Sequence, residues 1–325
     1  MKKVLPIALS GILALGGLYG SRAVADPPVV PPVVERDTSS FPLDLGTYEY
    51  ALRASVLGAG TVDGAVVSVG VHEYDGPVAR HDSCSSVDEY VSDVAFHGGR
   101  LYDLSLSFRV NNSIVGKAAS LVLDDSHIES VVRLSDDGRL VPVSCVMSVG
   151  RDGNVNRSEM MYDEDASIVR IKRNGRNFVV DIPQEYFSSL VTPPSLVVKI
   201  INTPVHRDGE RLSLGRFVDP ETGRLENIES VVSRVSRGDV SAECIQGYSG
   251  SSLLMGSTVT PASVFGGVSA RVGVFYTQDD GRGSFSAPMR GCLSFEMLNG
   301  GIIGSLADLT SSAYTSFVRY SRDER

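Results

Sequence analysis

The sequence contains no tryptophan and little histidine or cysteine. Aromatic residues make up 7% of its 325 positions, and it has only five histidines and four cysteines. A core without tryptophan must rest largely on valine, leucine and isoleucine. The five histidines limit the candidates for a general base, because histidine fills that role most often near neutral pH.

The sequence also lacks a net positive charge and nucleotide-binding motifs. The formal net charge is −9 at pH 7, and an acidic exported chain is a poor match for nucleic acid or an anionic lipid surface. The sequence has no glycine-rich phosphate loop and no dinucleotide fingerprint. Its cysteines are too widely spaced for a zinc site. We therefore expect no metal, no organic cofactor and no nucleic-acid partner.

Long apolar runs are confined to the N-terminus. The basic start Met1-Lys2-Lys3 is followed by an apolar segment over residues 4–20 and by Ala23-Val24-Ala25. This order is typical of a secretory signal peptide, with cleavage expected after Ala25. Its removal takes away three basic residues and no acidic one, so the formal charge changes from −9 to −12. No later run can span a bilayer, which predicts a secreted or periplasmic protein without an integral membrane segment after cleavage.

The rest of the chain has the residue pattern of a β protein. Residues 26–47 include a proline-rich stretch that we interpret as a tether. Short segments rich in valine, isoleucine, leucine and aromatics follow, separated by Gly, Asn, Asp and Ser; residues 101–108 and 195–201 are examples. Such a pattern favours an all-β fold. Apolar residues at spacings of three and four predict one closing helix over residues 305–321.

One short loop has the composition of an acyl-transfer site. Gln246-Gly247-Tyr248-Ser249-Gly250-Ser251 places Ser249 between two glycines. Glycine before the serine lets successive backbone N–H groups point into one concavity, and glycine after it leaves room for a substrate. A nucleophile and its oxyanion hole can arise from one loop in this way. Plain Gly/Ser turns share the composition, so the interpretation needs a base and an acid elsewhere.

Two further segments supply a candidate base and a candidate acid. His127 follows the apolar run 120–123 and a polar turn, which places it at the end of a buried strand. Asp165 precedes the apolar strand 168–171, where a shielded carboxylate can hold an imidazole tautomer. His97 is a second candidate for the base, and Asp163 and Glu164 are further candidates for the acid.

The order His, Asp, Ser, each in its own setting, resembles that of the chymotrypsin-like serine proteases, and in particular of their exported bacterial members. Residues 120–128 are similar to the family's strand-turn-histidine segment, and residues 165–171 to the strand that begins with the orienting aspartate. Residues 246–251 resemble the G-D-S-G loop, and residues 263–270 the strand that pairs with bound substrate.

The resemblance implies a site and a mechanism. His127 would act as general base, Asp165 as its orienting acid and Ser249 as nucleophile. The backbone N–H groups of Gly247 and Ser249 would form the oxyanion hole. These roles describe an exported serine endopeptidase that cleaves protein or peptide substrates through an acyl-enzyme and needs no cofactor.

The resemblance also implies a fold. Members of the family have two antiparallel six-stranded β-barrels, with the site in the crevice between them. Here the first barrel would cover residues 48–172 and the second would lie within 173–325, which also holds the C-terminal helix. Ser269 and Ala270 would lie on the strand that pairs with substrate.

Several features leave the function open. Glu243 near the primary pocket would favour basic substrate residues, whereas Arg271 would favour acidic ones. Tyr248 stands where the family has an aspartate that pairs with a newly cut N-terminus, so activation by cleavage is in doubt. The alternative function is a secreted, non-catalytic β-barrel binding module with a protease-like fold and no turnover.

The four cysteines form an even set. In an oxidising compartment they allow two disulfides with three possible connectivities. We favour Cys244–Cys292 and Cys84–Cys145, although some of the four could instead be buried free thiols.

Overall fold

The computed structural model describes residues 45–56, 60–81, 83–98, 100–110, 125–151, 154–240, 253–265, 269–278, 285–298 and 313–322. The strands are β1 (Gly46–Val56), β2 (Gly60–Glu73), β3 (Arg100–Val110), β4 (Ser126–Leu134), β5 (Leu140–Arg151), β6 (Asn154–Asp163), β7 (Ile168–Arg173), β8 (Arg176–Asp181), β9 (Arg211–Val218), β10 (Leu225–Val235), β11 (Leu253–Val259), β12 (Ser269–Gln278), β13 (Phe285–Leu298) and β14 (Ala313–Arg322). The helices are α1 (Val87–Phe96), α3 (Gln184–Phe187) and α4 (Pro193–Asn202), with short 3₁₀ turns at η1 (Arg237–Asp239) and η2 (Ala262–Phe265).

The strands form one antiparallel sheet in the order β8-β7-β6-β5-β4-β3-β2-β1-β14-β13-β12-β11-β10-β9. All neighbours are consecutive in the chain except β1 and β14, which pair from Gly46↔Arg322 to Arg53↔Tyr314. This pairing joins the first strand to the last one, so the two ends of the sheet, β8 and β9, come from the middle of the chain. The segment between them carries α3 and α4.

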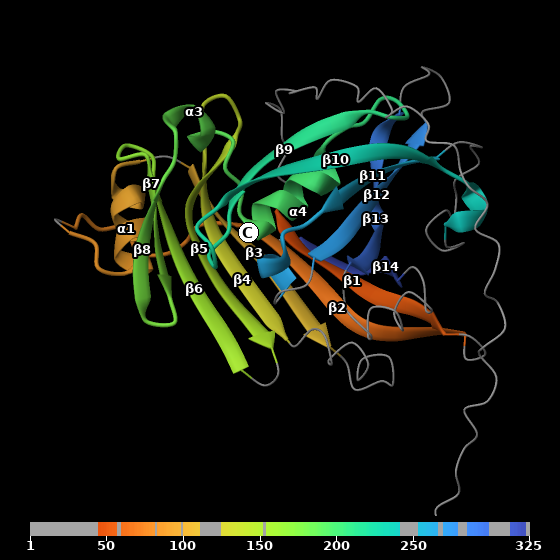
Figure 1. Ribbon diagram of the computed structural model, residues 1–325, viewed down its shortest axis with the longest axis horizontal. Helices are drawn as coiled ribbons and strands as arrows, with labels where there is room; N and C mark the ends of the chain where they lie inside the picture. The colour runs from red at the N-terminus through yellow and green to blue at the C-terminus, as the bar shows by residue number, and fades with distance from the viewer. Residues whose placement is uncertain are drawn as a thin grey trace, which may run out of the picture. The chain divides into compact units, whose positions relative to one another are not determined.

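Helix α4 is the element around which the sheet bends. It contacts β2, β3 and β4 from one half of the sheet and β9 and β13 from the other, and Figure 1 shows it enclosed between the two halves. A helix that is apolar on nearly all sides must be covered in this way. Its buried residues are Pro193, Pro194, Ser195, Leu196, Val198, Ile200 and Ile201. The main core therefore lies between α4 and the inner face of the sheet.

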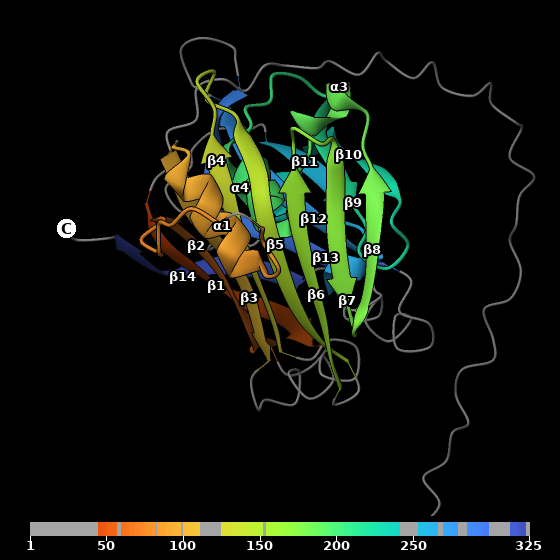
Figure 2. The same ribbon diagram turned by 90° about the vertical axis from the view of Figure 1, so that its left-hand side faces the viewer.

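Alternation along the strands separates an inner face from an outer face. On β4, Ile128 and Val132 are buried, whereas His127 and Glu129 are exposed. Helix α1 packs on the outer face, against β5 and β6, and Figure 2 shows it in front of the sheet with α4 behind. A Ser86/Glu89 capping box fixes the start of α1.

The two ends of the sheet meet through side chains at the β9–β10 turn. Arg173 Nη2 on β7 lies 2.5 Å from Glu221 Oε1 in this turn. Gly223 of the same turn approaches β8 so closely that an added Cβ would lie 3.2 Å from a Val180 methyl. The edge of β9 is covered by its own chain, because Arg216 N donates to Ser189 O at 2.8 Å and Val191 N donates to Arg216 O at 2.8 Å.

The all-β prediction is confirmed, but the two six-stranded barrels are not found among the described strands. Strands from both 48–172 and 173–325 belong to one sheet. Alternation identifies a strand but not its partner, and the β1–β14 pairing depends on residues at opposite ends of the chain.

Two helix assignments also differ from expectation. Residues 313–321 of the predicted closing helix belong to β14, which pairs with β1 and β13; hydrogen bonding to two neighbours overrides the helical spacing. Residues 195–201, expected as a strand, belong to α4. Residues 1–44, with the predicted signal peptide and most of the tether, and residues 305–312 lie outside the described part. Within that part, no helix has the length and apolar character needed to cross a membrane.

Candidate functional site

Part of the predicted protease site lies outside the residues that the structure describes. This applies to the nucleophile Ser249, to Gly247, and to Glu243 and Cys244. His127 and Asp165 are described, as are Ser269, Ala270 and Arg271, three of the four residues expected to contact substrate. Their positions test how well the rest of the predicted site could assemble.

His127 lies on the outer face of β4 and has an acidic neighbour other than the expected one. Its Cα is in register with Ser107 on β3 and Ser148 on β5. Its Nε2 lies 2.9 Å from Oε1 of Glu129, two residues along on the same face. Both side chains are more than half exposed.

Asp165 lies far from His127. It is exposed in the turn between β6 and β7, directly after Glu164, whose Oε2 is 2.5 Å from Nη2 of Arg133. Arg133 is on β4, six residues from His127, which corresponds to about 20 Å at the rise of a β-strand. The structure therefore does not bring Asp165 or Glu164 to His127.

Asp163 and His97 make local contacts of their own. Asp163 Oδ2 lies 2.9 Å from Arg170 Nη2. His97 is the C-cap of α1, and its Nδ1 lies 2.9 Å from the Asp93 carbonyl oxygen. Neither residue approaches His127 or its neighbours on β4 through a described contact.

The predicted substrate-pairing strand 263–270 is wrong in its first part, because residues 263–265 belong to the 3₁₀ turn η2. Ser269 and Ala270 begin β12, which is an interior strand of the sheet. Arg271 on β12 is in register with Val259 on β11 and with Glu296 on β13. Ala270 is buried, and its backbone N–H and carbonyl both bond to Thr260. Ser269 is in register with Leu298. A peptide needs a free strand edge to add to a sheet, and β12 offers none at Ala270 or Arg271.

The predicted Cys84–Cys145 disulfide is wrong, because both residues are free cysteines. Cys145 is fully buried, and burial raises the pKa of its thiol far above the ordinary value. Cys292 lies on β13, but Cys244 is outside the described residues, so their pairing stays a prediction. The part of the chain that the structure describes has no group of three His, Cys, Asp or Glu arranged to hold a metal ion.

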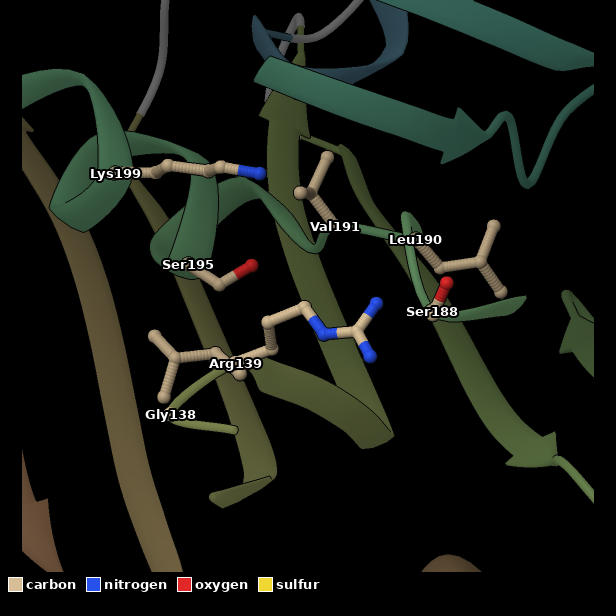
Figure 3. Close-up of a pocket in the computed structure, with 8 residues that line it drawn as sticks. Gly138, Arg139, Ser188, Leu190, Val191, Ser195 and Lys199 are labelled. Carbon is tan, nitrogen blue, oxygen red and sulfur yellow. The ribbon is translucent and has the colours of Figure 1, made fainter. Parts of the chain in front are cut away.

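A different site is present where the β4–β5 turn meets α4. A cavity of about 40 Å³ opens there, and Figure 3 shows the side chains around it. Three segments line it: the turn with Arg139, the strand-like segment before α4, and α4 itself with Lys199. The full lining is Gly138, Arg139, Leu140, Ser188, Leu190, Val191, Ser195 and Lys199. We call it the Arg139–Lys199 pocket.

The first turns of α4 position Lys199. The Thr192 hydroxyl caps the helix by accepting from Ser195 N, and the Ser195 hydroxyl accepts from Thr192 N at 2.8 Å. Lys199 comes one turn later, so it shares the face of Ser195. In Figure 3 the Lys199 chain extends across the pocket toward Val191.

The Lys199 ammonium is in an unusual environment for a lysine. The residue is partly buried, and burial lowers its pKa below the ordinary value, with the nearby Arg139 charge as a second cause. Among the described residues, no carboxylate and no hydrogen-bond acceptor pairs with its Nζ. Burial of a charge without a partner costs free energy. The Lys199 ammonium should therefore destabilise the folded protein when no ligand is bound.

Arg139 is held at the mouth of the pocket by its turn. Ser135 N donates to Arg139 O at 2.9 Å, and Gly138 takes a positive φ of 80° that closes the turn. The guanidinium forms an ion pair with Asp137. Hydrogen bonds from Arg139 and Ser135 lower the pKa of the Asp137 carboxyl well below its ordinary value.

Arg216 fixes the third wall of the pocket. Its Nη1 donates to Ser189 Oγ at 2.8 Å, and its guanidinium lies 3.9 Å from the centre of the Tyr186 ring. These contacts hold the segment that carries Ser188, Leu190 and Val191. The pocket is therefore built from elements with their own supports, as a preformed binding site requires.

Sequence reasoning misses this pocket for an identifiable reason. The Asp136-Asp137-Gly138 turn is evident from its residues, but the segment with Lys199 is predicted as a strand, where no partner can be inferred for the lysine. The available signal is one lysine within the apolar run of residues 193–201.

No protein-family model, no curated protein and no solved structure matches this chain.

Proposed function

We propose that the protein is an exported, non-catalytic binding module that holds an acidic group of its ligand in the Arg139–Lys199 pocket. The Lys199 ammonium carries the proposal, because it lies in a partly buried pocket without a counter-charge in the described part of the chain. A ligand that supplies the negative charge would offset the cost of burying it. Arg139 at the mouth adds a second positive group.

The positions of the predicted triad residues favour binding over peptide hydrolysis. A serine protease needs its base within hydrogen-bond reach of the nucleophile and an acid that orients the base. Asp165 follows Glu164, which pairs with Arg133 about 20 Å along β4 from His127. The His127 imidazole pairs with Glu129 instead. The serine endopeptidase stays a prediction that rests on the sequence around Ser249.

Two measurements test the proposed function. A fluorophosphonate probe should not label the mature protein; labelling that disappears in both Ser249→Ala and His127→Ala would overturn the non-catalytic proposal. The melting temperature should rise with at least one small anion at constant ionic strength, and the rise should be lost in Lys199→Met. Lys172→Met is the matched control, because Lys172 is exposed and pairs with Glu159.

If no small anion raises the melting temperature, or if Lys199→Met responds like the wild type, the Arg139–Lys199 pocket is not the binding site.

A further inference from the structure

The charges around the Arg139–Lys199 pocket define which ligands suit it. The lining contributes two positive side chains and no carboxylate. Asp137 neutralises part of the Arg139 charge through their ion pair. The Lys199 charge is balanced by no carboxylate of the described residues, and a single negative charge on the ligand would balance it. A doubly charged phosphate would leave an excess of negative charge beside Asp137.

The donors in the pocket suit a group with two acceptor oxygens. The Lys199 ammonium and the Arg139 guanidinium each have N–H groups to donate. The Ser195 hydroxyl is occupied by Thr192, to which it bonds in three ways. The two cations can each meet one oxygen of a carboxylate, and Ser188 adds a hydroxyl to the lining.

Three apolar side chains, those of Leu140, Leu190 and Val191, also line the pocket, together with Gly138 and Ser188. The cavity of about 40 Å³ has room for roughly three water-sized atoms. A carboxylate fills most of that volume, and a short hydrocarbon group beside it would contact the apolar lining residues.

We infer that the pocket binds the carboxylate of a small monocarboxylic acid, held between Lys199 and Arg139 with its apolar substituent against Leu140 and Leu190. This inference rests on the proposed function and names the ligand class of the same site. The shared chemistry is a carboxylate on an apolar stem, which a free short-chain acid and the C-terminus of a peptide both present.

Binding of this kind must be linked to the protonation of Lys199. Burial and Arg139 favour the neutral amine in the empty pocket, whereas a bound carboxylate favours the ammonium. The ligand therefore raises the pKa of Lys199, and binding takes up protons where the empty pocket is partly deprotonated. A lysine with a purely structural role would show no such uptake.

The test is titration calorimetry of the mature protein at constant ionic strength with butyrate, butyramide, inorganic phosphate and an acetylated dipeptide ending in leucine. Butyrate should bind at least about tenfold more tightly than neutral butyramide, as expected for loss of charge-assisted hydrogen bonds. It should also bind more tightly than phosphate. Lys199→Met and Arg139→Gln should each weaken butyrate binding by about tenfold or more, with Lys172→Met unchanged.

The outcomes separate this inference from the proposed function. Tighter binding of phosphate than of butyrate would overturn the monocarboxylate class but would keep an anion-binding module. Equal binding of butyrate and butyramide would overturn it as well, because the pocket would then recognise only apolar surface. Tighter binding of the peptide than of butyrate would identify a peptide C-terminus as the source of the carboxylate, and the reverse order a free acid. If none of the four probes binds, both proposals are overturned.

Discussion

Lys199 on α4 and Arg139 in the β4–β5 turn line the same small pocket, and the charge of Arg139 is one of the two causes that lower the pKa of Lys199. Two positive side chains brought together in a partly apolar setting destabilise each other. A ligand that supplies a negative charge would offset this cost.

The first prediction concerns stability without ligand. Lys199→Met removes the buried charge and keeps a long apolar side chain, so the free energy of unfolding should increase by on the order of 1 kcal/mol. Denaturant unfolding in a buffer free of small carboxylates measures it. Lys172→Met should leave the unfolding free energy within about 0.5 kcal/mol of the wild type. A Lys199→Met protein less stable than wild type would show that the ammonium has a stabilising partner.

The pH dependence of binding gives a second prediction. The pKa of Lys199 in the empty pocket is below its ordinary value. At pH values above the pKa of butyrate itself, its affinity should be constant up to the pKa of Lys199 and should fall as the pH rises through it, because only the ammonium attracts a carboxylate. Lys199→Arg should bind with no such decrease over the same range, since arginine stays protonated. A wild-type affinity that does not change with pH would remove Lys199 from the binding site.

A third prediction concerns the segment that forms the pocket wall. Gly215 on β9 has a φ of 128°, and an added Cβ would lie 2.5 Å from Ser189 O and 2.7 Å from a Val191 methyl. Gly215→Ala should therefore displace the segment 188–191, with a loss of about 2 kcal/mol or more in stability and weaker butyrate binding. Gly209, at a φ of 75°, is the control because its added Cβ would meet nothing within 4 Å.

Gly209→Ala should cost only about 1 kcal/mol and should leave butyrate binding unchanged. Equal effects of the two substitutions on binding would contradict the role of the Gly215 contact.

The outer face of the sheet supplies a prediction that is independent of the pocket. Burial raises the pKa of Asp103 to about 6, with the charges of Asp75 and Glu129 as further causes, while His72 lowers it. The folded protein then binds a proton that the unfolded chain has lost at the same pH. Stability should therefore fall as the pH rises from about 4, the ordinary value for an aspartate, through about 6.

Asp103→Asn should remove this part of the pH dependence. Above pH 6 the variant should be more stable than the wild type by on the order of 1 kcal/mol, since partial exposure screens the carboxylate. Denaturant unfolding at pH 5 and pH 7 provides the comparison. A wild type and variant with parallel pH profiles would contradict the raised pKa.

The sequence predicts the strands better than it predicts their arrangement. Alternation in residues 101–108 correctly identifies β3, because burial of one face imposes a period of two. Nothing local indicates that β1 pairs with β14, since that register depends on two segments at opposite ends of the chain. Pairing between such distant strands depends on contacts across the whole sheet and cannot be inferred from either segment alone.

The helices could have been found from their caps. Ser86 and Glu89 form an S-x-x-E capping box before α1, and Thr192 precedes Pro193 and Pro194 at the start of α4. At α4 the signal is hidden because the apolar residues 195–201 also match a strand pattern. The candidate site is missed with them, because the place of Lys199 beside Arg139 requires both α4 and the bend of the sheet around it.

The central claim is that the Lys199 ammonium receives its counter-charge from a ligand carboxylate. Its most direct test is an NMR titration of the protein labelled with ¹³C at lysine Cε, in which the pKa of Lys199 is measured with and without saturating butyrate. The account predicts that butyrate raises the pKa of Lys199 and leaves that of Lys172 unchanged. A Lys199 pKa that is the same with and without butyrate would contradict it.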